Sequence, residues 1–176
     1  MIRRPLNKFV VVLFCILLGG CFKSRESLID STNASYPFKR ASILMANFPD
    51  KGKTKAFSIE RFSRSYEFTN LAEEDKQFKN IQIMFYKVNN ETYVMQWRDS
   101  SLPDFDMFII KITDNKFFMH TCFSYMDQTL FQLGIKKDGG RCSITNLGKL
   151  VRLAQVSPDE PRAQESVMTG EILLME

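Results

Sequence analysis

Residues 81–98, which read IQIMFYKVNNETYVMQWR, predict a hairpin of two β-strands. Two runs rich in β-branched and aromatic residues flank Asn89 and Asn90, and asparagine tolerates the positive φ of a two-residue hairpin turn. Such a turn pairs Val88 with Glu91 and so determines which side chains share a face. On this register one face carries five large side chains: Met84, Tyr86, Tyr93, Met95 and Trp97.

This aromatic and methionine face has more than one interpretation. Methionine commonly fills gaps in cores, but aromatic–methionine surfaces also hold apolar ligands or partners, and thioethers can bind Cu(I). The opposite face of the hairpin, with Ile81, Ile83 and Phe85, is also apolar. A helix can cover one of the two faces, so the face with Tyr93 and Trp97 is a candidate contact with a partner or ligand. No metal site is assigned.

Residues 106–123, DMFIIKITDNKFFMHTCF, predict a second hairpin. Its turn is Asp114-Asn115, which pairs Thr113 with Lys116. This register places Ile112 opposite Phe117, Ile110 opposite Met119 and Phe108 opposite Thr121. We expect that face to belong to the core.

The remaining elements suggest an α+β fold. Strands are expected at Ser42–Phe48, Lys55–Phe62 and Thr129–Lys136. Asn70 with Glu73 resembles a capping box that opens a short helix over 70–78. Ser143 can cap a second helix, with apolar residues at helical spacing: Ile144, Leu147, Val151 and Ala154. The sequence therefore predicts a mainly antiparallel β-sheet of hairpins with a C-terminal helix packed on it.

The N-terminal segment has the pattern of an export signal. Arg3, Arg4 and Lys8 precede an apolar run over residues 9–18. That run is too short to span a bilayer, which needs roughly 20 apolar residues. It fits the apolar region of a secretory signal peptide.

The end of this run resembles the lipobox of bacterial lipoprotein precursors: Leu18-Gly19-Gly20-Cys21. The resemblance covers about the first 22 residues. It implies cleavage before Cys21, a diacylglyceryl thioether on Cys21 and anchoring in the bacterial cell envelope. The residue after the cysteine is Phe22 and not aspartate, which by the family rule favours the outer membrane.

These features divide the chain into four parts. Residues 1–20 are the expected signal peptide, and residues 21–35, which are mostly polar, are the expected tether. Residues 36–156 form the single α+β domain. Residues 157–176, which begin with a segment rich in proline and charge, are expected to be a linker or flexible tail.

The charge of the mature chain argues against nucleic acid as a partner. Removing the signal lowers the basic count from 24 to 21, against 20 acidic residues. Nucleic-acid binding usually requires a concentrated basic face, and the near-neutral balance gives no sign of one. The expected partners are the membrane, through the lipid on Cys21, and an envelope protein.

Two cysteines, Cys122 and Cys142, remain after processing removes Cys15 and lipidates Cys21. In an oxidising compartment such a pair is usually a disulfide. The two are too far apart in the chain for the C-x-x-C arrangement of redox pairs. We expect a structural bridge.

No catalytic residues and no cofactor are assigned. His120 is the only histidine, and no G-x-S-x-G or H-E-x-x-H motif accompanies it. The sequence therefore favours a non-enzymatic accessory or binding lipoprotein of the periplasm or cell surface, whose sheet contacts an envelope partner. The alternatives are a small envelope hydrolase that uses His120, or an inhibitor or immunity-type lipoprotein directed against a cell-wall enzyme.

Overall fold

The computed structural model of the chain describes residues 22–46, 54–70, 81–138, 141–156 and 168–175. The expected signal peptide with Cys21 and almost all of the helix expected over 70–78 lie outside these residues. Within them, no helix is both long enough and apolar enough to cross a membrane.

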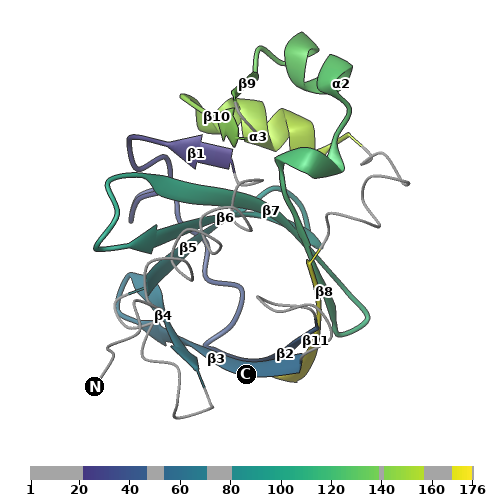
Figure 1. Cartoon of the computed structure of the whole chain (residues 1–176). Helices are drawn as coiled ribbons and strands as arrows, with labels where there is room; N and C mark the ends of the chain where they lie inside the picture. Colours follow the sequence, from purple (N-terminus) through teal and green to yellow (C-terminus); the bar gives the residue numbers. More distant parts are fainter. Residues whose placement is uncertain (1–21, 47–53, 71–80, 139–140, 157–167, 176) are drawn as a thin grey trace, which may run out of the picture.

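Eight antiparallel strands close into a barrel, which Figure 1 shows nearly end-on. They are β2 (Arg40–Ala46), β3 (Thr54–Phe62), β4 (Ser65–Asn70), β5 (Ile81–Lys87), β6 (Thr92–Asp99), β7 (Phe105–Thr113), β8 (Lys116–His120) and β11 (Met168–Met175). Each strand pairs with its neighbour in this order, and β11 pairs with both β8 and β2 to complete the ring.

The expected α+β class is therefore wrong, and two segments account for most of the difference. Residues 168–175, expected to belong to a linker or tail, form the strand that closes the barrel. Residues 129–136 were expected to form a strand, but 129–132 lie in the short helix α2 (Asp127–Gln132) and 133–134 form the turn that follows it. The strands expected at Ser42–Phe48 and Lys55–Phe62 correspond to β2 and β3.

The barrel interior is filled by the inward-facing side chains of its strands, as in other small barrels. Alternate residues of β5 point inward, namely Ile81, Ile83 and Phe85, and all are buried. Phe38 enters the same cluster from the segment before β2. There the hydroxyl of Tyr66 donates a hydrogen bond of 2.5 Å to the Phe38 carbonyl. The interior is thus an aromatic core.

An outer layer covers one side of the barrel, over β6 and β7 (Figure 1). The elements of the outer layer are β1 (Phe22–Ser24), the 3₁₀ turn η2 (Cys122–Ser124), α2, β9 (Lys136–Asp138), β10 (Arg141–Ser143) and α3 (Leu147–Ala154). A second apolar cluster fills the space between this layer and the barrel, and includes Phe22, Ile109 and Leu153.

β7 joins the barrel to the outer layer. Its second half, from Ile109, pairs with β8, whereas its first residues, Phe105 to Met107, pair with β1. β10 then runs parallel to β1, and β9 pairs with β10. The stretch expected to be the tether after Cys21 therefore contains a paired strand, and Ile29 further along it is buried.

The hairpin over residues 81–98 forms, but its register differs by one residue from the expected one. Tyr86 pairs with Val94 and Lys87 with Tyr93. The Asn89 side chain explains the shift, because its Oδ1 accepts hydrogen bonds from the backbone N–H groups of Glu91 and Thr92. This bonding favours a three-residue loop, and a slip of one residue exchanges the faces of one strand.

The hairpin over residues 106–123 agrees with expectation. Thr113 pairs with Lys116, and Ile112 with Phe117. Asp114 and Asn115 have φ values of 51° and 61°, as a two-residue turn of this kind requires. The expected C-terminal helix is also present, although it is capped by Asn146, whose side chain accepts a hydrogen bond from Gly148, and not by Ser143.

Candidate functional site

The expected contact face does not exist as one surface. Tyr93 and Met95 point into the barrel and are buried, and Trp97 packs against the same interior cluster. Met84 and Tyr86 face the opposite way and pack into the outer cluster. The one-residue change of register separates the two groups, so the hypothesis of a shared binding face is wrong on geometric grounds.

The expected disulfide between Cys122 and Cys142 is present, with Cα atoms 5.9 Å apart. Both cysteines are fully buried in the outer cluster. The bond joins η2 to β10, and Cys142 also pairs with Phe22 of β1. It thereby fixes the segment that leads from β8 into α2.

Three exposed apolar side chains of the outer layer lie in α2 or in the turn before it, and a fourth, Val156, follows α3. Phe131 is 82% exposed, Met126 49% and Phe123 39%. A single exposed apolar side chain is ordinary, but several that lie close together commonly mark an interaction site. We call these three residues, with the pocket beside them, the α2 surface.

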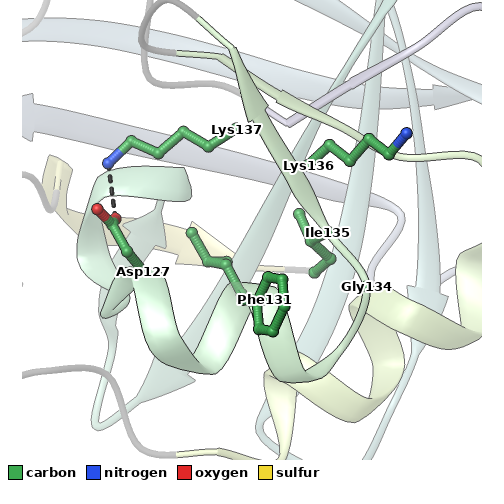
Figure 2. Close-up of a pocket in the computed structure, with 7 residues that line it drawn as sticks. Asp127, Phe131, Gly134, Ile135, Lys136 and Lys137 are labelled. Atoms are coloured by element: carbon green, nitrogen blue, oxygen red, sulfur yellow. Dashed lines mark hydrogen bonds and ion pairs between the residues drawn. The ribbon is translucent and has the colours of Figure 1, made fainter.

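The pocket beside Phe131 has a volume of about 650 Å³. Its lining is formed by Asp127, Leu130, Phe131, Gly134, Ile135, Lys136 and Lys137. Figure 2 shows Lys137 reaching across to Asp127, at 2.8 Å, while Lys136 points the other way. The Lys137 ammonium also lies 5.3 Å from the centre of the Phe123 ring. The site therefore combines an apolar floor with cationic groups at its rim.

The shape of the pocket depends on how α2 ends. The N–H of Ile135 donates to the carbonyl of Leu130 at 2.9 Å, and the N–H of Gly134 to that of Phe131, also at 2.9 Å. Gly134 has a φ of 63°, so the helix ends in a Schellman motif with glycine at the left-handed position. Leu130 and Ile135 are buried beneath this turn, which leaves Phe131 on the outside.

Sequence reasoning missed the α2 surface because residues 129–136 were interpreted as a strand. Leu130, Leu133 and Ile135 give a pattern that fits a short strand as well as a single helical turn. The available signal was Gly134, which follows Leu133 and precedes an apolar residue, as in a helix C-terminus. Asp127 in the first turn is consistent with that interpretation.

An ion pair between Lys23 and Asp106 ties β1 to the first half of β7. Burial raises the pKa of the Asp106 carboxyl, although the ammonium of Lys23 acts in the opposite direction. The pair lies beside Trp97, which is opposite Asp106 in the β6–β7 ladder. Because the ion pair joins two neighbouring strands, we assign it a structural role in keeping β1 paired with β7.

His120, the residue of the hydrolase alternative, lies on β8 opposite Ile109 and near the Tyr125 ring, at 6.5 Å between centres. Its Nδ1 is buried and has no hydrogen-bond partner among the described residues. Burial, with a smaller contribution from Lys111, lowers its pKa from 6.5 to about 4. The ring is thus neutral near pH 7.

This low pKa predicts a pH dependence of stability. At pH 5 the unfolded chain binds a proton at His120 that the folded chain does not, so folding becomes less favourable as the pH falls from 6.5 towards 4. For a partly accessible ring we expect about 1–2 kcal/mol at pH 5. The His120→Gln protein should gain that much relative to the parent between pH 7 and pH 5, measured by urea unfolding. Parallel changes in the two proteins would contradict the prediction.

Within the described parts of the chain, no three His, Cys, Asp or Glu side chains gather closely enough to hold a metal ion. No protein-family model, no curated protein and no solved structure matches the chain.

Proposed function

We propose that this protein is a lipid-anchored protein of the bacterial envelope, held by a diacylglyceryl group on Cys21, that binds an envelope component without catalysing a reaction. The lipobox pattern Leu18-Gly19-Gly20-Cys21 supports the anchor. The residue after Cys21 is Phe22 and not aspartate, which by the rule for bacterial lipoproteins supports an outer-membrane location.

The observation that carries the binding role is the α2 surface. A phenylalanine that is 82% exposed, beside an apolar pocket, is a suitable anchor for a partner. The Cys122–Cys142 bond and the Schellman turn hold this surface in place before any partner arrives, which lowers the entropic cost of binding.

The environment of His120 favours binding over hydrolysis. A general base works best with a pKa near the operating pH and within hydrogen-bond reach of the substrate. The pKa of His120 is lowered to about 4 by burial, and the ring lies against Tyr125 and Ile109 in the outer cluster. These properties suit a packed side chain.

Site-specific photo-crosslinking in cells tests the binding role. A photoreactive phenylalanine analogue replaces Phe131 in one protein and Phe62 in a matched control. Phe62 is 67% exposed but lies at the end of β3, across the barrel from α2 (Figure 1). We expect adducts, detected by mass spectrometry, at position 131 and not at 62. Equal labelling at both positions would remove the α2 surface from the proposal.

The anchor is tested in the same cells with a fatty-acid probe. The parent protein should take up the probe, and the Cys21→Ser protein should not, because the thioether forms only on that sulfur. Incorporation that persists in the Cys21→Ser protein would refute lipidation at Cys21 and leave the crosslinking result to stand by itself.

A further inference from the structure

We propose that the α2 surface rests on the membrane that holds the protein's own anchor, with Phe131 and Met126 among the lipid head groups and Lys136 on anionic phosphate. This inference rests on the proposed function, because it requires the lipid on Cys21. It names anionic phospholipid as the component that the α2 surface binds.

The proposed anchor at Cys21 is joined to the folded body without a spacer. Phe22 is the residue directly after Cys21, and it is fully buried and paired with Met107 and Cys142. Adjacent Cα atoms are only about 3.8 Å apart. A lipid on Cys21 therefore holds the outer layer against the bilayer.

The segment that leads into α2 contacts the start of β1. Phe22 pairs with Cys142, which is bonded to Cys122, and the exposed Phe123 follows Cys122 in the chain. The Phe22 ring also lies 6.3 Å, centre to centre, from that of Tyr125, the residue before Met126. Phe123 thus follows a cysteine bonded to the strand partner of Phe22, and Met126 follows a tyrosine that contacts Phe22 itself.

Positive charge is concentrated in the outer layer. Residues 121–156, which make up most of the outer layer, carry five basic and two acidic residues, a formal charge of +3. The remainder of the chain from residue 21 carries sixteen basic and eighteen acidic residues. The outer layer, to which the anchor is joined, therefore carries a net positive charge, which anionic lipids attract.

The side chains on this surface suit the membrane interface. Phe131 and Met126 are exposed apolar groups, and Lys136 is an exposed cation of the same pocket. Apolar side chains that enter the head-group region, beside lysines that stay at the phosphates, are typical of interfacial binding. A protein partner or a second copy of this chain would cover the same residues without needing lipid, so the two cases can be distinguished.

The test uses the full-length, lipidated protein in vesicles whose acyl chains are brominated. Phe131→Cys and, as the matched control, Phe62→Cys each supply the single free thiol of the processed protein, because Cys21 carries the lipid and Cys122 is bonded to Cys142. Each thiol is labelled with a fluorophore. One set of vesicles contains phosphatidylethanolamine and phosphatidylglycerol in equal parts, and the other contains phosphatidylcholine alone.

We expect lipid bromine to quench the label at position 131 at least about twofold more than the label at 62 in the anionic vesicles, and this difference to shrink in phosphatidylcholine. Lys136→Glu should reduce the difference, whereas Lys116→Glu, an exposed lysine on the β7–β8 hairpin, should not.

Two results would overturn the inference. One is equal quenching at 131 and 62 in a protein whose intact mass shows the lipid on Cys21, which leaves the proposed anchor standing. The other is a label at 131 that is shielded from both bromine and an aqueous quencher, which indicates a protein or a second copy on the α2 surface. An intact mass without the lipid would overturn the anchor and the inference together.

Discussion

A chain that ends at residue 167 should fail to fold. Without β11, the ladder edges of β2 and β8 lose their partners along six and four residue pairs respectively, and the interior loses the buried Ile172. The opened barrel would expose two unpaired edges, a common cause of aggregation. We expect the loss to exceed the total stability of a domain of this size, about 5–15 kcal/mol, as measured by circular dichroism and gel filtration.

Two neighbouring residues of β11 provide the control. Ile172 faces the interior and is buried, whereas Leu173 is exposed. Ile172→Ala should cost about 2–5 kcal/mol and Leu173→Ala at most about 0.5 kcal/mol. A truncated protein that remains a folded monomer would show that the strand is dispensable and that the barrel does not need closure.

Replacing both Cys122 and Cys142 with alanine should lower the free energy of unfolding by about 3 kcal/mol. The bridge closes a loop with a sequence separation of 20 residues, and the chain-entropy model gives roughly this value for such a loop. The double substitution avoids an unpaired buried thiol. Urea unfolding measures the change, and hydrogen exchange should show the largest loss of protection in η2 and β10.

The disulfide prediction has a functional control. If the bond holds the α2 surface ready for contact, crosslinking from position 131 should fall in the double variant, while the barrel retains its strand content. A change in stability below about 1 kcal/mol would indicate that the surrounding apolar cluster holds these segments without the bond.

The hairpin over residues 106–123 could be predicted because its turn residues decide its register alone. Asp114 and Asn115 adopt the positive φ values that a two-residue turn needs, so both strands follow. The neighbouring hairpin was misassigned by one residue because Asn89 makes two side-chain hydrogen bonds to the backbone of its own loop. The register of this hairpin therefore depends on hydrogen bonds within the loop, which composition and the alternation of apolar residues do not reveal.

The closing strand was missed for a different reason. The register of β11 against β2 shifts between Ile172 and Leu174, an irregularity that interrupts the alternation of inward and outward residues. The apolar residues of the segment therefore show no period in the sequence. Its partners, β2 and β8, are also distant along the chain, so nothing local identifies it as a strand. The α2 surface could not be predicted for a similar reason. The helix α2 has only six residues, which is too short to show a helical period in the sequence.

β6 and β7 are buried on both faces along most of their length. Successive residues of these strands point to opposite faces. Met95, for example, belongs to the apolar cluster inside the barrel, and Val94 to the cluster beneath the outer layer. Neither cluster can lose its order without exposing one face of these two strands. The molecule should therefore unfold in a single cooperative transition, and a load placed on the outer layer is borne by the barrel as well.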